Sequence, residues 1–245
     1  MTGPCNLSVI IPAFNEGPAI HKTITTTAQY LAGLPLSWEM IVVDDGSQDT
    51  TAADVTAAAT ATAPEQIRLI RHTRNLGKGA AIRTGVLASA GQFVLFCDAD
   101  SATPIEELGK FLPRLRDGAD IVVGSRRITG SEVRRRQPWP RQFLGTVYVW
   151  LTNLLVVPGI SDITCGFKAL RRRAAHEIFS RAHVTGWSFD AELFYLARRL
   201  RYRIVEVPIT WADQPNTKVR VARDAMVSLY DLVRIRWRAM TGQYR

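Results

Sequence analysis

Short apolar runs that each end in polar residues are the feature of this sequence that most restricts its fold. Four of them, at residues 7–14, 39–43, 67–70 and 93–97, lack the strict apolar–polar alternation of a strand with one face in water. Runs of this kind are typical of strands that are buried on both faces of a parallel sheet. We therefore predict an α/β fold with a mostly parallel central sheet flanked by helices.

The segments between these runs have the composition of helices. They are residues 18–34, with a proline at the start, the alanine-rich residues 50–62, and residues 79–90. A fifth strand is expected at residues 121–123 and a later one at residues 204–211, where Pro208 favours a sheet edge or a strand end. Ligands of such sheets bind beyond the carboxyl ends of the strands, so a site is expected there.

The chain is long enough for one sizeable core. It has 245 residues, 47% of them hydrophobic, and neither a linker nor a repeat divides it, so we predict one domain over residues 1–245. The first residues lack the basic start of a signal peptide, and their apolar run is too short to span a bilayer, which favours the cytoplasm. Cys5, Cys97 and Cys165 have no paired spacing and are expected to be free thiols without a disulfide partner.

All five expected strand ends carry charged side chains. In chain order these are Glu16, Asp44 and Asp45, Arg74 and Lys78, Asp98 and Asp100, and Arg126 and Arg127. Any one of them alone is equally well explained as a turn former or a helix cap. Because the carboxyl ends of parallel strands meet at one sheet edge, five charged ends together indicate a site for a metal-bound phosphate ligand.

The segment FVLFCDADSATP gives this site its most specific residues. Asp98 and Asp100 stand two positions apart on an extended stretch, so their side chains point the same way. Without a partner, the two carboxylates would repel each other, and each would raise the pKa of the other. A divalent cation between them and a diphosphate removes this repulsion. Mg²⁺ or Mn²⁺ fits such oxygen donors. Lys78, in NLGKGAA at the start of an expected helix, is placed to reach a phosphate, although the segment is neither a Walker A motif nor a dinucleotide fingerprint.

Six segments occur along the chain in a recognisable order. They are SVIIPAFNE, IVVDDGSQDTT, RNLGKGAAIRTG, DADSATP, VVGSRR and DITCGFKALRR. In this combination the chain resembles the inverting family-2 glycosyltransferases with the GT-A fold, in particular the dolichyl-phosphate glucosyltransferase and dolichyl-phosphate mannose synthase branch. The resemblance runs from about Leu7 to about Met240.

The resemblance implies a reaction and a division of the domain. The reaction is metal-dependent transfer of a hexose, glucose before mannose, from a UDP-sugar or GDP-sugar to a polyprenyl or dolichyl phosphate. It would take place at the cytoplasmic face of a membrane. Residues 7–130 would form a nucleotide-sugar-binding half, residues 131–211 an acceptor-side half, and residues 212–245 a basic amphipathic helix.

The resemblance also implies roles for individual residues. Asp100 would hold the metal, with Asp98 as a second ligand that lies against the nucleotide, and Arg126 and Lys218 would face phosphates. The remaining donor contacts would come from Pro12, Ala13, Phe14, Glu16, Asp44, Asp45, Lys78 and Ala99. Phe14 stands where a tyrosine is common, and residues 101–103 lack the glutamine that assists the metal in some mannosyl relatives. The metal shell would therefore rest more on Asp100 and water.

Two other functions remain open at this point. A lipid phosphate is already an anionic nucleophile, whereas a hydroxyl acceptor needs a general base, for which Asp190 in GWSFDAEL is the candidate. The competing interpretation of Asp190 is a carboxylate that interacts with a helix N-terminus. A non-catalytic nucleotide- or RNA-binding module would instead use the net charge of +9. Aromatic residues are not interleaved with the basic runs, which argues against nucleic acid as a partner.

Two segments predict peripheral contact with an anionic membrane surface. In residues 143–160 one helical face carries Phe143, Leu144, Val147, Leu151, Leu154 and Leu155. Near the C-terminus a second apolar stripe carries Val221, Met226, Leu229, Val233 and Trp237, bordered by arginines. Apolar faces flanked by arginine suit an anionic bilayer. The alternative for the last segment is a helix docked on the core with a solvated basic face.

Overall fold

The computed structural model describes residues 5–214 and 221–244, the side chains of the second segment from residue 226 onward. Its centre is a seven-stranded sheet in the order β3-β2-β1-β4-β7-β5-β8. The strands are β1 Leu7–Ala13, β2 Trp38–Asp44, β3 Ile67–Arg71, β4 Phe93–Phe96, β5 Ile121–Ser125, β7 Lys168–Arg171 and β8 Ile204–Pro208. All neighbours pair in parallel except β7, which is antiparallel to β4 and β5. The mostly parallel sheet predicted from the apolar runs is confirmed.

Two strands were not expected from the sequence. β7 enters the middle of the sheet between β4 and β5, although a buried lysine, Lys168, begins it. β6 Glu132–Arg135 and β9 Thr210–Ala212 form a separate two-stranded sheet, and all four residues of β6 are exposed. β6 and β7 are short, and their residues lack an apolar run. The single strand expected at residues 204–211 is divided between β8 and β9. Pro208 is the last residue of edge strand β8, as its missing N–H requires.

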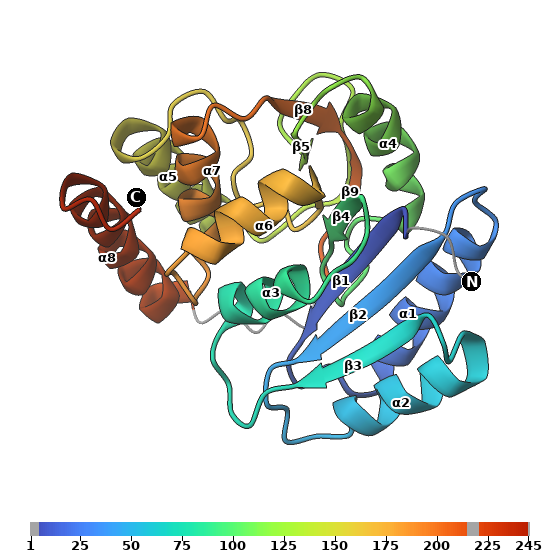
Figure 1. Cartoon of the computed structure of the whole chain (residues 1–245). Coiled ribbons are helices and arrows are strands. Elements are labelled where there is room, and N and C mark those ends of the chain that lie inside the picture. Colours follow the sequence, from blue (N-terminus) through green and yellow to red (C-terminus); the bar gives the residue numbers. More distant parts are fainter. Residues whose placement is uncertain (1–4, 215–220, 245) are drawn as a thin grey trace.

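Helices cover both faces of the sheet (Figure 1). They are α1 Gly17–Ala32, α2 Thr51–Thr62, α3 Lys78–Leu87, α4 Leu108–Arg116, α5 Trp139–Leu155, α6 Arg172–Arg181, α7 Phe189–Arg199 and α8 Val221–Met240, with a 3₁₀ turn at Ile105–Glu107 before α4. Side chains alternate along each strand, so Val9 and Ile11 pack with α1, α2 and α4, while Ile10 packs with α3, α6 and α7 on the other face. Each face has its own buried apolar core.

Helices α5 and α8 pack against each other at the outside of the sheet face that α3, α6 and α7 cover (Figure 1). α8 is docked through Leu232 and Ile235, which are fully buried. The outward side of the pair leaves large apolar side chains in solvent, and these are Trp139, Phe143, Leu144, Trp150, Leu154, Leu155, Met226, Val227, Leu229, Tyr230, Val233, Trp237 and Met240. Among the described residues, no helix combines the length and the apolar character that crossing a bilayer requires.

Candidate active site

The end of β4 places a carboxylate against the start of α3. Asp98 is half-buried, and its Oδ1 accepts a hydrogen bond from Lys78 Nζ at 2.5 Å. Lys78 is the first residue of α3, so the helix start brings its ammonium to the strand end. Burial opposes ionisation of Asp98, but Lys78, followed by Lys168 and Arg126, holds the pKa of Asp98 below its ordinary value. The pair is therefore ionised at neutral pH.

Lys78 is surrounded by acidic side chains and one aromatic ring. Its burial disfavours the ammonium, yet Asp98, Asp190 and Asp100 outweigh that effect and raise the pKa of Lys78. The ring of Trp187, a 43% exposed residue, lies 5.2 Å from Lys78 Nζ, within the range of a cation–π contact. A charged lysine under an exposed indole is a suitable contact for an anionic ligand.

Asp100 lies at the surface beside this pair. Its Oδ1 accepts a hydrogen bond from the Ala102 backbone N–H at 3.0 Å, and no described residue donates to its Oδ2. Ser101, between them, has φ +54°, a left-handed backbone that is costly for a residue other than glycine. Partial burial and the charge of Asp98 raise the pKa of Asp100 to about 6.

These two carboxylates suit a cation that also binds a ligand. Within the described ranges, no group of three or more His, Cys, Asp or Glu side chains gathers into a cation site. A cation at Asp98 and Asp100 would complete its shell with phosphate or water oxygens, as Mg²⁺ commonly does. The available Oδ2 and the raised pKa of Asp100 agree with a site that gains by adding positive charge.

The turns after β1 and β2 form the neighbouring part of the site. Asn15 N–H donates to Ser47 Oγ at 2.9 Å, and Glu16 N–H donates to Thr51 Oγ1 at 2.8 Å, so the two turns hold each other. The charge of Glu16 contributes to the raised pKa of Asp100, which places it near the carboxylates. The predicted donor residues at these strand ends are Pro12, Ala13, Phe14, Glu16 and Asp44.

The two acidic residues after β2 have different surroundings. Asp44 is fully buried; its Oδ1 accepts from the Ser47 N–H at 2.9 Å and its Oδ2 lies 3.0 Å from Arg71 Nε as an ion pair. Asp45 accepts from the Leu76 and Gly77 N–H groups at 2.9 and 2.8 Å and contacts His72 Nδ1 at 2.7 Å. These contacts use both oxygens of Asp45 to hold the loop before α3.

A buried lysine behind the carboxylates was not found from the sequence. Lys168 Nζ donates to Asp190 Oδ1 at 2.7 Å and to the Cys165 carbonyl, and its side chain is fully buried. Burial raises the pKa of Asp190, against the effect of Lys168. The only signal in the sequence is a lysine inside the otherwise apolar CGFKAL. The candidate base Asp190 is thus a member of an internal ion pair.

Gly166 leaves room for the Asp98 side chain. A Cβ atom at residue 166 would lie 1.9 Å from Asp98 Oδ2, far inside contact distance. The loop that carries Gly166 and leads into Lys168 of β7 therefore fits directly against the acidic end of β4.

Arg126 is fixed beside the site by three partners. Its Nε and Nη2 donate to Asp162 Oδ2 and Oδ1, both at 2.7 Å, and its Nη2 also donates to Thr164 Oγ1 at 2.9 Å. Trp211 lies under the guanidinium at 5.0 Å. Burial disfavours the cation, but Asp162 raises the pKa of Arg126. Lys218, the other predicted phosphate contact, lies outside the described residues.

Comparison with known proteins decides the family. The sequence profile of glycosyl transferase family 2 matches residues 8–179. The chain belongs to glycosyl transferase family 2. It is 37% identical to a dolichyl-phosphate beta-glucosyltransferase of Trichomonas vaginalis, over 92% of this chain and 69% of that protein. It is 35% identical to the dolichyl-phosphate beta-glucosyltransferase of Mus musculus, over 98% of this chain and 77% of that protein.

Solved structures share the fold of this family 2 transferase. Glucosyl-3-phosphoglycerate synthase from Mycobacterium tuberculosis, solved with Mn²⁺, UDP-glucose and phosphoglyceric acid, matches with a TM-score of 0.70 at 18% identity, over 94% of this chain and 79% of that one. Mannosyl-3-phosphoglycerate synthase from Rubrobacter xylanophilus also matches with a TM-score of 0.70, at 20% identity, over 98% of this chain and 75% of that one. The predicted GT-A fold and glycosyltransferase class are confirmed.

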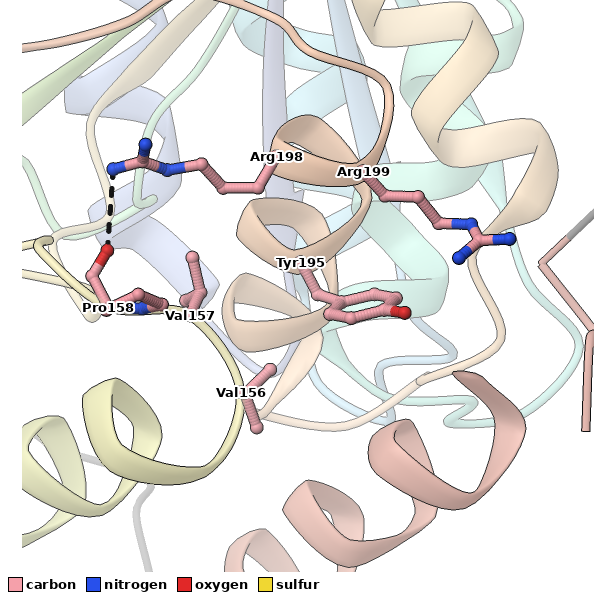
Figure 2. Close-up of a pocket in the computed structure, with 6 residues that line it drawn as sticks. All are labelled: Val156, Val157, Pro158, Tyr195, Arg198 and Arg199. Carbon is pink, nitrogen blue, oxygen red and sulfur yellow. Dashed lines mark hydrogen bonds between the residues drawn. The ribbon is translucent and has the colours of Figure 1, made fainter. Parts of the chain in front are cut away.

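A separate pocket in the transferase lies between the end of α5 and α7. It is lined by Val156, Val157, Pro158, Tyr195, Arg198 and Arg199 (Figure 2). Arg198 turns toward the Pro158 carbonyl at 3.4 Å, whereas Arg199 extends away from it (Figure 2). The two guanidinium groups do not converge on one point, and none of the predicted site residues lines this pocket.

Proposed function

We propose that this transferase moves glucose from UDP-glucose to a dolichyl or other polyprenyl phosphate, with a divalent cation, at the cytoplasmic face of a membrane. The observation that carries the proposal is the Asp98–Lys78 pair with Asp100 at the strand ends of a family 2 domain. The relatives over nearly the whole chain are dolichyl-phosphate beta-glucosyltransferases, and related folds were solved with UDP-glucose and Mn²⁺. The names of the relatives support glucose over mannose, and the solved complex supports uridine over guanosine.

In this proposal the protein stabilises the departing diphosphate. The bond from the sugar to the diphosphate breaks through an oxocarbenium-like state, and negative charge develops on the leaving group. The Lys78 ammonium and the Arg126 guanidinium are preorganised cations that would receive this charge. Asp100 and Asp98 would hold the cation, which would add further positive charge at the diphosphate.

The acceptor end needs no general base if the acceptor is a phosphate. A phosphate monoester is ionised at neutral pH and attacks the anomeric carbon directly, with inversion. Asp190, the residue that a hydroxyl acceptor would require, is ion-paired to Lys168 at 2.7 Å and buried. A carboxylate held in this way is poorly placed to remove a proton from a substrate, which favours the lipid phosphate.

Donor choice tests the proposal. With polyprenyl phosphate and Mn²⁺ or Mg²⁺, the purified protein is expected to form a glucosyl lipid from UDP-glucose at least about ten times faster than a mannosyl lipid from GDP-mannose, because a site that pairs with one base leaves polar groups unpaired with another. Lipid product would be separated and its sugar identified. Preferential turnover of GDP-mannose would assign the protein to mannosyl transfer instead.

The outer side of α5 and α8 is the proposed membrane surface. Trp150 is 61% exposed and Trp237 is 54% exposed, and both helices carry further exposed large apolar side chains. The exposed charged residues of α8 from residue 226 are arginines, Arg234 and Arg236, whereas Asp231 is buried. Flotation with vesicles that contain an anionic lipid is expected to carry the protein, and Trp150→Ser with Trp237→Ser to reduce this binding. Equal binding of the variant would reject the surface.

A further inference from the structure

Glu192 is a fully buried carboxylate with no part in the proposed chemistry. Its Oε2 accepts hydrogen bonds from the His183 and Val184 backbone N–H groups at 2.8 and 2.7 Å. Its Oε1 accepts from the Tyr244 hydroxyl at 2.5 Å and lies 3.8 Å from Arg238 Nη1. A buried charge is tolerated when it is paired and hydrogen-bonded in this way. One side chain of α7 thus joins the loop before α7, residues 183–187, to the C-terminal segment, residues 238–244.

That loop is the surface on which the start of α3 rests. The Thr185 carbonyl accepts from the Ala80 N–H at 3.1 Å. A Cβ atom on Gly77 would lie 2.4 Å from Thr185 O, and one on Gly79 would lie 2.7 Å from Val184 O. Both glycines flank Lys78, so a displacement of the loop displaces the residue that pairs with Asp98.

The C-terminal segment reaches the same loop from the other side. Tyr244 is 1% exposed, and its ring lies 5.7 Å from the His183 ring and 5.5 Å from the Tyr195 ring. Asp231 of α8 approaches Gly186, and Ser188 Oγ lies 3.5 Å from the Ser228 carbonyl. The loop is therefore held between α8 and α3.

We propose that Glu192 is a positioning residue for Lys78. Tyr244 supports this role, because its hydrogen bond to Glu192 connects the C-terminal segment to the loop at residues 183–187. The inference rests on the proposed function, in which Lys78 faces the donor diphosphate. The effect passes from Tyr244 through Glu192 to the Val184 and Thr185 backbone, and from there to the glycines around Lys78. Neither Glu192 nor Tyr244 touches the substrate.

Removing the Tyr244 hydroxyl is the mildest test, because Phe keeps the ring contacts. Tyr244→Phe is expected to weaken cation-dependent UDP binding about 5-fold, a change of the size of the net contribution of one hydrogen bond. The matched control is Tyr202→Phe, which removes a Tyr–Glu hydrogen bond of the same length, from Tyr202 to Glu177 on α6. Titration calorimetry gives the dissociation constants, and thermal unfolding reports stability separately.

A background without Lys78 separates positioning from general stability. In Lys78→Met, adding Tyr244→Phe is expected to leave UDP binding unchanged, because the effect acts through the lysine. Glu192→Gln, whose amide oxygen can still accept from the loop, serves as a second variant and is expected to behave like Tyr244→Phe. If Tyr244→Phe and Tyr202→Phe bind UDP equally well, the inference is wrong and the proposed function stands. If the wild-type protein binds no UDP, the proposed donor is wrong and the inference falls with it.

Discussion

Asp100→Asn is expected to reduce glucosyl transfer by at least about 100-fold, since a preorganised charge contact to a leaving group typically supplies that much. The asparagine keeps the shape of the side chain and the Ala102 N–H bond to Oδ1. Only the charge that would bind the cation is lost. Turnover is measured at saturating donor and acceptor. The control is Asp117→Asn, which neutralises an exposed carboxylate at the end of α4.

The stability of Asp100→Asn distinguishes a lost ligand from a damaged fold. The pKa of Asp100 is raised to about 6, above its ordinary value of 3.8, by burial and by Asp98. An acid whose pKa is higher in the folded state destabilises that state where it is ionised, above pH 6, and this cost disappears as the pH falls toward 4. Without cation at pH 7.5, Asp100→Asn should therefore melt at or above the wild-type temperature. A variant that retains half of the wild-type turnover would show that Asp100 is not the metal ligand.

Lys168→Met is expected to destabilise the fold by about 3–5 kcal/mol, the cost of removing one partner of a buried ion pair. The methionine fills the space between Phe96 and Phe194 but leaves the Asp190 carboxylate buried without its cation. Urea unfolding measures the change. Arg134→Met, which breaks the exposed pair with Glu132, is the control and should leave the midpoint almost unchanged.

Asp190→Asn should recover much of this stability in the Lys168→Met background, because it removes the uncompensated charge. The same substitution in the wild-type background tests the acceptor. If the acceptor is a phosphate, the folded Asp190→Asn enzyme retains substantial turnover. Abolished turnover in a stable Asp190→Asn protein would indicate a general base and a hydroxyl acceptor.

The strands and the acidic strand end were predictable because their information is local. The apolar run before Asp98 ends where β4 leaves the sheet, and the alternation of Val9, Ile10 and Ile11 follows from burial on both faces. The helices predicted between the first strands are present within a few residues of their expected bounds. Exposure of Met226, Leu229, Val233 and Trp237 also follows the predicted stripe, while Leu232 and Ile235 dock the same helix on the core.

Residues whose role depends on distant partners could not be recognised. Lys168 meets Asp190 only because β7 enters the sheet antiparallel between β4 and β5. Gly166 is required by the position of Asp98, and Glu192 by the return of the chain at Tyr244. Asp45, a predicted donor contact, also has partners that its place after a strand does not reveal, since His72, Leu76 and Gly77 contact its oxygens. These partners are distant along the chain, so the sequence around each residue does not predict the contacts.

The most direct measurement is UDP release from UDP-glucose with and without a short polyprenyl phosphate, in the presence of Mn²⁺ or Mg²⁺. The site of Lys78, Arg126, Asp98 and Asp100 is expected to release UDP at least about ten times faster when the lipid phosphate is present, with one glucosyl lipid formed per UDP. A chelator should abolish this release. UDP formed equally fast without the lipid, or release insensitive to the chelator, would contradict glucosyl transfer to a lipid phosphate at this site.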